Sequence, residues 1–394
     1  MTPDGSLPAR SPIAATARPA SGGTRNLLII GATGIFGRKL VRHLSGEPGL
    51  RLFLGARDDA RAAGLAAEIA PHAEATLTPV AVDTRRTLGE TLARLKPWCV
   101  VDCTGPFQEA DHRVARAALE AGAHIVDIAD APGYLGGYAE ALDACARRAG
   151  RAAIGGASST PALSGAVVSH LAEPMREVTD IEIVIAPGGR GRVGRAVIEA
   201  VLSYAGRAVP AWRAGKLGHL TGWRGAKRIR IDGLGPRRAA PVETADAALL
   251  GPRFGVRGDI VFRASLESIP EQLGMEVLAA LRSLWQSMPL RWLAAPLLGM
   301  RALTRIGTSD TGAMQVTLRG SGPDGDEATA HWTLIARKGD GPVVPILPAA
   351  AAVRALAAGR LGPGARLASE ALTLPEIVAE MEPYAIEIRT VSAV

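Results

Sequence analysis

The chain has 394 residues, of which 47% are hydrophobic and 21% charged, and its 45 basic and 38 acidic residues give a formal net charge of +7. This length predicts two or three domains, and the apolar share excludes a wholly disordered or fibrous chain. The basic balance suits phosphorylated ligands or other polyanions without choosing among them. The cysteines, Cys99, Cys103 and Cys145, are not spaced as zinc ligands, so we expect a cytoplasmic protein with no metal site.

The N-terminal segment and the longest apolar stretch argue against a signal peptide and a transmembrane helix. Residues 1–25 are rich in Pro, Ala, Ser and Gly and lack the apolar core of a signal peptide, so we expect a disordered tail there. No window offers the roughly 18 uninterrupted apolar residues of a transmembrane segment. The stretch from Leu278 to Leu303 is interrupted by arginines and prolines, which favours two amphipathic helices. Their apolar face leaves three contacts open: a membrane surface, a partner subunit or an apolar substrate.

The first half of the chain alternates short apolar runs with segments of helical period, as consecutive βαβ units do. The predicted strands are Leu27–Gly31, Arg51–Gly55, Leu77–Asp83, Trp98–Thr104, His124–Ile128 and Ala152–Gly155. The predicted helices are Phe36–Leu44, Asp59–Ala70, Leu88–Leu95, Gln108–Ala121 and Tyr134–Arg148. Right-handed crossovers place such helices on both faces of a parallel sheet, so the predicted fold is α/β, Rossmann-like and doubly wound.

After Pro174 the pattern changes to longer strands and predicts a second, α+β domain. Its predicted strands are Val178–Ala186, Lys227–Ile231, Asp259–Leu266, Ala313–Gly320 and Ala328–Arg337, with helices around Val193–Tyr204 and Glu271–Leu303. Two further helices are predicted at Ala349–Ala358 and Pro375–Met381. We therefore predict a tail over 1–25, a first domain over 26–175, a second over 176–339, and a segment, 340–394, that packs back on the first domain.

A glycine motif, Gly31-Ala32-Thr33-Gly34-Ile35-Phe36-Gly37, follows the first predicted strand and opens the first predicted helix. In this context the first glycine permits a tight turn, the second lets the backbone approach a pyrophosphate, and the third allows close packing of helix on strand. The helix start offers free N–H groups and partial positive charge to phosphates. The motif predicts a dinucleotide site, with a glycine-rich structural turn as the alternative.

The end of the second predicted strand indicates which dinucleotide is bound. NAD enzymes usually place a carboxylate about 20 residues beyond the glycine motif to bind the ribose 2′-hydroxyl. Here Arg57 stands in that place, and an arginine there can bind the 2′-phosphate of NADP, whereas a carboxylate would repel it. The alternative is a merely solvated arginine. We expect Asp58, which follows, to cap the next helix.

Two more strand ends point toward the same crevice. Asp83 closes the third predicted strand and either reaches the adenine or caps the next helix. Thr104, Gly105 and Pro106 close the fourth with small residues, which either let the nicotinamide lie against the backbone or form a simple turn. The predicted NADP-binding residues are Gly31, Thr33, Gly34, Ile35, Phe36, Gly37, Arg57, Asp83, Thr104, Gly105 and Pro106.

With these residues in place, the chain resembles the bacterial saccharopine dehydrogenase-like (saccharopine reductase-type) NADP-binding oxidoreductase family. The similar segments are GATGIFGRKL at 31–40, VDCTGPF at 101–107, AGAHIVDIAD at 121–130, GGASSTPALSG at 155–165, GTSDTGAMQVTLRG at 307–320 and GPVVPILPAA at 341–350. The resemblance implies a Rossmann domain, a second domain for substrate binding and dimerisation, and NADPH-linked chemistry at a C–N bond. The sequence departs from the family pattern at Asp130-Ala131, where the family commonly has a Gly-Glu step.

Candidate proton donors follow the fifth predicted strand, where open α/β sheets place their ligands. They are Asp127, Asp130 and Tyr134, and for each of them helix capping or turn chemistry is the alternative. A Tyr and Lys four residues apart, as in short-chain dehydrogenases, do not occur. The glycine-rich segment 155–165 contains serines and no cysteine, which argues against a semialdehyde dehydrogenase.

The predicted function is an NADP-dependent oxidoreductase that transfers hydride to a C=N or C=O bond of a small substrate. The alternatives are a trans-acting enoyl reductase on carrier-bound acyl chains and a non-catalytic, NADPH-binding redox sensor. Six basic residues between 224 and 238 predict a solvated hairpin or a docking site for an anionic carrier. Without interleaved aromatics we expect no nucleic-acid binding, and we expect a homodimer with peripheral membrane contact left open.

Overall fold

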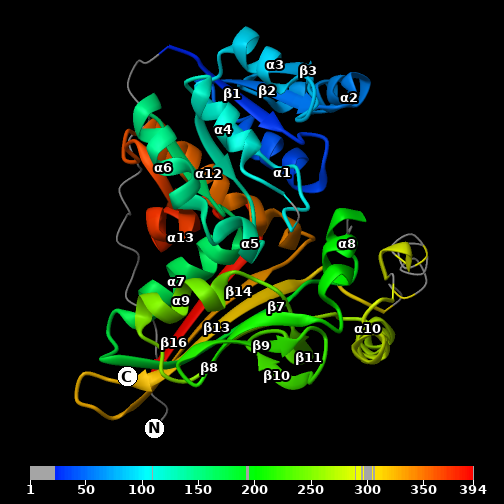
Figure 1. Ribbon diagram of the computed structural model, residues 1–394, viewed down its shortest axis with the longest axis vertical. Helices are drawn as coiled ribbons and strands as arrows, with labels where there is room; N and C mark the ends of the chain where they lie inside the picture. Colours follow the sequence, from blue (N-terminus) through cyan, green and yellow to red (C-terminus); the bar gives the residue numbers. More distant parts are fainter. Residues whose placement is uncertain are drawn as a thin grey trace.

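The structure, a computed structural model, describes residues 23–108, 110–191, 195–288, 290–293, 296, 304 and 307–393. Two β-sheets lie one above the other in the view of Figure 1, the first built mainly from residues before 156 and the second mainly from residues after 176. Residues 1–22 of the predicted tail and most of 289–306 lie outside the described residues.

The first sheet is wholly parallel, with the strand order β15-β6-β5-β4-β1-β2-β3. Its strands are β1 Arg25–Ile30, β2 Leu50–Ala56, β3 Thr76–Ala81, β4 Cys99–Asp102, β5 His124–Asp127, β6 Ala152–Gly155 and β15 Gly364–Leu367. The chain runs outward from β1 through β2 to β3 and then crosses back to β4 on the other side of β1. The crevice at the carboxyl ends of β1 and β4 is therefore the topological switch point, where open α/β sheets bind ligands.

Helices pack on both faces of this sheet. They are α1 Ile35–Leu44, α2 Asp59–Ile69, α3 Leu88–Leu95, α4 Arg113–Glu120, α5 Pro132–Leu135 and α6 Tyr138–Ala149. On one face α3, α4 and α6 contact one another in sequence, and α1 contacts α12, Leu347–Ala357, on the other. The strands are buried on both faces, which explains their nearly unbroken apolar runs, as in Leu27 to Ile30.

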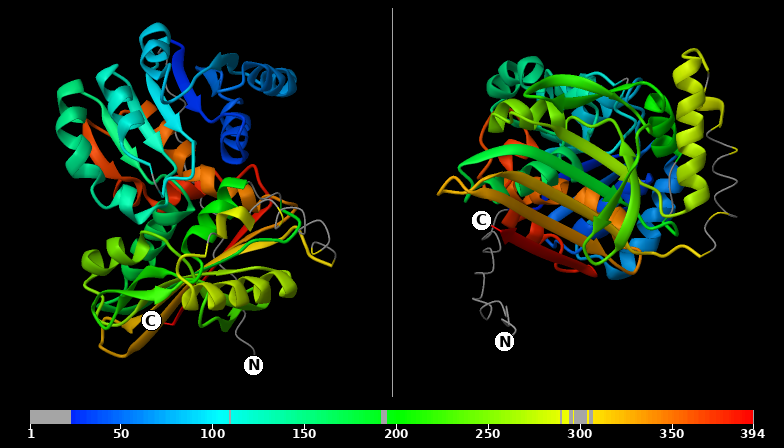
Figure 2. Two further views of the ribbon diagram at one scale, coloured as in Figure 1. Left: turned by 45° about the vertical axis from the view of Figure 1, so that its right-hand side comes forward. Right: turned by 90° about the horizontal axis from the view of Figure 1, so that it is seen from below.

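The second sheet is mixed and has the order β10-β11-β12-β7-β13-β14-β16, with β8 pairing to β12 and β9. Its strands are β7 Glu177–Ala186, β8 Ala208–Arg213, β9 Lys216–Thr221, β10 Lys227–Ile231, β11 Gly235–Pro241, β12 Ile260–Ser265, β13 Gly312–Ser321, β14 Glu327–Ala336 and β16 Ile386–Ala393. Only the β12–β7 pair in this order is parallel. The view from below in Figure 2 shows its strands in front of the helices.

The helices of the second half are α7 Ser164–Ala172, α8 Arg195–Tyr204, α9 Asp246–Phe254 and α10 Ile269–Leu284, with a 3₁₀ turn at Leu290–Leu293. Both α7 and α9 pack on the second sheet on the side of the first domain. At the start of α10 the Ser268 hydroxyl accepts a hydrogen bond from the Glu271 N–H, and Pro270 occupies the first turn. These are the usual signals of a helix start.

The C-terminal segment contributes to both sheets. A 3₁₀ turn at Gly341–Ile346 contacts α1, and the short helices α13 Ala368–Ala371 and α14 Leu374–Ala379 follow β15. The prediction assigned all of 340–394 to the first domain. That is wrong for β16, which pairs antiparallel with β14 along Thr329–Ala336 and extends the second sheet. The domain boundaries at residues 25, 175 and 339 stay predictions.

The predicted fold class, a Rossmann-like parallel sheet with a second α+β domain, is confirmed. The predicted helix Tyr134–Arg148 is in fact two helices, α5 and α6, because Gly136 and Gly137 separate them. The predicted helix Gln108–Ala121 begins only at Arg113. Strands β8, β9, β11, β15 and β16 and helix α9 were not predicted.

Candidate active site

The glycine motif forms a tight turn between β1 and α1. Gly31 has a φ of +78°, in the left-handed region that favours glycine, and its N–H donates to the Gly55 carbonyl at 2.9 Å. Gly34 is the N-cap of α1, and no side chain caps the helix start. The first turn of α1 also has no acidic residue, so its N–H groups face the switch point without a competing anion from that turn.

Close backbone packing explains why this turn is built from glycines. A Cβ atom at Gly37 would lie 2.1 Å from the Gly31 carbonyl oxygen, and one at Gly31 would lie 2.9 Å from the Cys103 carbonyl oxygen. Both distances are shorter than the contacts that Cβ atoms make in proteins, so only glycine fits at these two positions. Thr33, Ile35 and Phe36 are half-buried around the turn, while Gly34 is exposed at the helix start. The predicted residues of the motif therefore lie together in the turn after β1 and the first turn of α1, with Gly34 exposed and Gly37 buried.

Arg57 follows β2 and is exposed, with no hydrogen bond or ion pair to the described residues. The neighbouring Asp58 is already engaged, because its carboxylate accepts a hydrogen bond from the Arg61 N–H as the N-cap of α2. This confirms the expected capping role of Asp58. It leaves Arg57 as the charged side chain at the end of β2 that can turn toward a ligand.

Asp83 lies in the loop after β3 and is half-buried. Its carboxylate accepts hydrogen bonds from the Arg85 and Arg86 N–H groups at 2.8 and 3.1 Å, so it organises the loop. The carboxylate thus accepts hydrogen bonds from backbone N–H groups, as a capping residue does. Whether it also contacts the adenine stays a prediction.

Thr104, Gly105 and Pro106 form the loop after β4, next to β1 at the switch point. The Thr104 N–H and hydroxyl both donate to the Asp102 carboxylate, at 2.9 and 2.6 Å, while Gly105 and Pro106 are exposed. Asp102 is 4% exposed, and burial raises the pKa of its carboxyl. The loop therefore exposes Gly105 and Pro106 to solvent, while the buried carboxyl group of Asp102 fixes its first residue, Thr104.

Asp127 and Tyr134, two of the three predicted proton donors, contact each other inside the protein. The Tyr134 hydroxyl donates to Asp127 at 3.3 Å, and the same carboxylate accepts the Gly156 and Ala129 N–H groups at 2.9 and 3.1 Å. Asp127 is 1% exposed and Tyr134 4% exposed. Burial, more than any neighbour, raises the pKa of Asp127 to about 6.

Asp130, the third predicted donor, is exposed and stands three residues beyond β5. Although solvent reaches it, the protein groups packed around its carboxyl disfavour the charged form and raise its pKa. Its negative charge also contributes, after burial, to the raised pKa of Glu243, in the segment that joins β11 to α9. Asp130 is therefore close enough to this segment of the second domain to act on it electrostatically.

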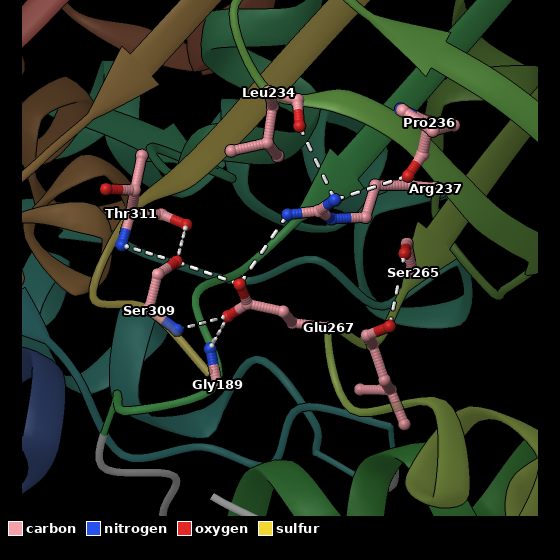
Figure 3. Close-up of polar contacts among 9 residues, drawn as sticks. Gly189, Leu234, Pro236, Arg237, Ser265, Glu267, Ser309 and Thr311 are labelled. Carbon is pink, nitrogen blue, oxygen red and sulfur yellow. Dashed lines mark hydrogen bonds and ion pairs between the residues drawn. The ribbon is translucent and has the colours of Figure 1, made fainter. Parts of the chain in front are cut away.

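A carboxylate that the sequence analysis did not select, Glu267, holds three loops of the second domain together (Figure 3). Its oxygens accept the Gly189 N–H at 2.8 Å, the Ser309 N–H at 3.0 Å and the Ser309 hydroxyl at 2.9 Å, and Arg237 lies 3.6 Å away. These hydrogen bonds outweigh partial burial and lower the pKa of Glu267. In the sequence, only the family-like segment 307–320, which contains Ser309, pointed to this region, and a family resemblance does not reveal which residues are in contact.

Within the described residues, no group of three or more His, Cys, Asp or Glu side chains is arranged to hold a metal ion. Among the described helices, none combines the length and the apolar character that crossing a membrane requires.

Fold and site together define a class: an α/β protein whose parallel sheet carries a nucleotide-binding glycine turn at its switch point. Residues 27–154 match the family model of the saccharopine dehydrogenase NADP binding domain. This part of the chain is therefore similar to the NADP-binding domain of the saccharopine dehydrogenase family, and the predicted resemblance is confirmed. No curated protein matches the chain.

Solved structures of dehydrogenases are similar to the whole chain. The apo, histidine-tagged saccharopine dehydrogenase (L-Glu forming) from Saccharomyces cerevisiae is 14% identical, with a TM-score of 0.65, over 94% of this chain and 100% of its own. An amine dehydrogenase from Mycobacterium smegmatis is 12% identical, with a TM-score of 0.49, over 89% and 96%. At such identities the likeness to the yeast enzyme shows a shared fold.

Proposed function

We propose that the chain is an NADP(H)-dependent oxidoreductase that transfers hydride to a C=N or C=O bond of a small substrate. The observation that carries this proposal is the uncapped start of α1 at the switch point of the parallel sheet. The match of residues 27–154 to an NADP-binding domain supports it. A homodimer and a cytoplasmic location stay predictions.

The residues at the switch point fit a dinucleotide. The exposed Gly34 and the free N–H groups of α1 suit a pyrophosphate, and the missing Cβ atoms of Gly31 and Gly37 keep the turn close to the strand. The loop at Thr104, Gly105 and Pro106 would hold the nicotinamide half. When bound, the nicotinamide supplies or accepts the hydride, and the protein supplies binding and orientation.

Arg57 is the residue that we propose to select NADP over NAD. A guanidinium bound to a phosphate contributes roughly 1.5 to 3 kcal/mol, and each 1.4 kcal/mol changes the dissociation constant about tenfold. We expect Arg57→Asp to weaken NADPH binding about 10-fold to 100-fold and to leave NADH binding nearly unchanged. Fluorescence titration of the purified protein with each cofactor measures both constants.

Arg51 offers a matched control, because it is an exposed arginine at the opposite end of the same strand, β2. Arg51→Asp changes the net charge by the same amount but leaves the switch point intact. Equal weakening in the two variants, or equal and weak binding of NADPH and NADH by the unchanged protein, would remove Arg57 as the phosphate ligand.

We propose that Asp130 gives the proton to the product nitrogen or oxygen, while Asp127 and Tyr134 form the buried support beneath it. The reason is access: Asp130 is exposed, and the other two are enclosed. Its raised pKa keeps part of the carboxyl protonated closer to neutral pH than an ordinary aspartate. Asp130→Asn should lower kcat at least about tenfold and flatten its pH profile, with NADPH affinity unchanged.

The substrate is sought by following NADPH consumption with ketones, with keto acids plus amines, and with enoyl thioesters. A second candidate, an enoyl reductase on carrier-bound acyl chains, is favoured by the apolar outer face of α10. Turnover with enoyl thioesters and with no carbonyl substrate would establish it in place of the first. Tight NADPH binding without turnover of any substrate would instead support a non-catalytic redox sensor.

A further inference from the structure

The outward face of α10 carries an unbroken apolar stripe. Six side chains form it, which we call the α10 stripe: Ile269, Leu273, Val277, Leu281, Leu284 and Trp285, exposed by 71%, 47%, 59%, 50%, 87% and 60%. Their spacing of three or four residues places them on one side of the helix. The three charged residues of α10 are buried or paired: Arg282 is buried, Glu276 is paired with Arg238, and the half-buried Glu271 accepts a hydrogen bond from the Thr304 hydroxyl. The most exposed side chains of α10 are therefore apolar.

The stripe is large for an exposed surface. Each of its six residues is at least 47% exposed, and contiguous apolar patches larger than a few hundred Å² are rare on monomers and mark interaction sites. Figure 2 shows α10 at the edge of the molecule, outside the second sheet, with its length parallel to the surface. An apolar surface of this size on an outer helix indicates an interaction partner.

Two arginines of β10, Arg228 and Arg230, which we call the basic row, lie on the face of the β10–β11 hairpin that contacts α10 through Arg238. The Arg238 guanidinium of β11 holds the Glu276 carboxylate of α10 at 2.6 Å. Arg228 of β10 is paired directly opposite Arg238 in the ladder, and Arg230 follows two residues later. Directly opposed residues of an antiparallel pair share a face, as do residues two apart on a strand. Arg228 and Arg230, both exposed, therefore lie on the face of the hairpin turned toward α10.

We propose that the α10 stripe and the basic row of β10 together dock the protein on an anionic lipid bilayer, with α10 lying in the plane of the interface. Apolar side chains enter the boundary of headgroups and acyl chains, and arginines beside them attract anionic headgroups. Trp285 at the end of α10 is of the residue type enriched at this boundary.

A second copy of the chain fits this surface less well. Two-fold pairing buries the same patch on both subunits, so it would bring two copies of the basic row into one interface. An anionic bilayer instead complements the apolar stripe and the basic row together. The proposal does not depend on the proposed enzymatic function.

The test is flotation of the full-length protein with lipid vesicles. We expect binding to vesicles of phosphatidylcholine with about one third phosphatidylglycerol, and weak binding to phosphatidylcholine alone or at high salt. Val277→Glu with Leu281→Glu should reduce binding at least about tenfold, because charges at these positions oppose entry into hydrocarbon. Arg228→Glu with Arg230→Glu should abolish the preference for anionic vesicles.

Val391 provides the matched control, because it is a 55% exposed apolar side chain on β16, at the opposite edge of the second sheet from β10. Val391→Glu should leave vesicle binding unchanged. Circular dichroism verifies that all variants remain folded, and because it needs no cofactor, this test is separate from that of the proposed function.

Three outcomes would overturn the proposal. The unchanged protein floats with neither vesicle, or the double variant of α10 still floats normally. In the third, the unchanged protein forms a dimer that Val277→Glu with Leu281→Glu dissociates, with no vesicle binding, and a second copy then covers the stripe.

Discussion

At the turn before α1, single atoms decide whether helix and strand can meet. Gly37 lies where a methyl group would stand 2.1 Å from the backbone oxygen of Gly31, and backbone cannot rotate out of the way as a side chain can. Gly46, after the same helix, has no atom within 4 Å of the corresponding position. A Cβ atom therefore clashes with the backbone at Gly37 and fits freely at Gly46.

We expect Gly37→Ala to lower the free energy of unfolding by about 2 to 3 kcal/mol, because α1 must move away from β1. The same shift displaces the start of α1, so NADPH affinity should also fall. Urea denaturation and cofactor titration measure the two effects. Gly46→Ala, the control, should leave both nearly unchanged, and a tolerant Gly37→Ala would contradict the tight packing described here.

The buried carboxyl of Asp127 links stability to pH. Its pKa in the folded protein is about 6, whereas an unfolded aspartate titrates near 3.9. Between these values the folded protein binds a proton that the unfolded chain does not, so the contribution of Asp127 to the free energy of unfolding rises as the pH falls. This contribution is fully present below about pH 3.9 and is lost as the pH rises to about 6. The difference between the two pKa values corresponds to about 3 kcal/mol.

Asp127→Asn should reduce this pH dependence, because the amide retains an acceptor for the Gly156 N–H but does not titrate. Urea denaturation at about pH 7 and about pH 4.5 is the measurement. The variant should gain less stability on acidification than the unchanged protein, by up to about 3 kcal/mol. Asp324→Asn, at an exposed position, should follow the unchanged protein. A pH profile unaltered by Asp127→Asn would show that this carboxyl is not responsible.

At the scale of elements, α1 is fixed at its far end by the C-terminal segment. His43 Nε2 donates to the Glu380 carboxylate at 2.6 Å, and the Arg354 guanidinium of α12 donates to the same carboxylate at 2.6 Å. The His43 and Glu380 side chains are each 4% exposed. The helix that we propose to hold the pyrophosphate is therefore positioned by residues more than 300 positions later in the chain.

We expect Glu380→Ala to lower the free energy of unfolding by about 2 to 4 kcal/mol, since it leaves the Nε2 of the buried His43 without its acceptor and removes one of the two carboxylates paired with Arg354. Thermal and urea unfolding measure the loss. Glu387→Ala is the comparison, because Glu387 pairs with Arg337 and Arg389 at the surface, and such pairs contribute about 1 kcal/mol or less. Similar losses in the two variants would argue against a special role for Glu380.

The elements that could be predicted are those that local sequence determines. The strands of the first sheet are apolar on both faces, and the turn at Gly31 to Gly37 has a fixed spacing, so both are visible in the sequence. The partners of Glu267 are not, because Gly189 and Ser309 are brought to it by tertiary folding and follow no period. For the same reason, the enclosure of Asp127 and the exposure of Asp130 appear only in the folded protein.

At the scale of the whole molecule, the chain crosses between the two sheets more than once. It leaves the first domain at α7, returns after β14 through the 3₁₀ turn at 341–346, and crosses again before β16. The two later crossings are hydrogen bonded side by side, since the Arg337 N–H donates to the Ala385 carbonyl and the Ala385 N–H to the Asp340 carboxylate, both at 2.9 Å. The two domains are thus joined by neighbouring segments far apart in the sequence.

The positions of β15 and β16 have a consequence for biosynthesis. Each strand closes an edge of one sheet, and each is translated after all the other strands of its sheet. Neither sheet can reach its full width until that strand has left the ribosome, so nascent chains carry unpaired strand edges until then. Such an intermediate depends on rapid completion, or on chaperone protection, to avoid aggregation.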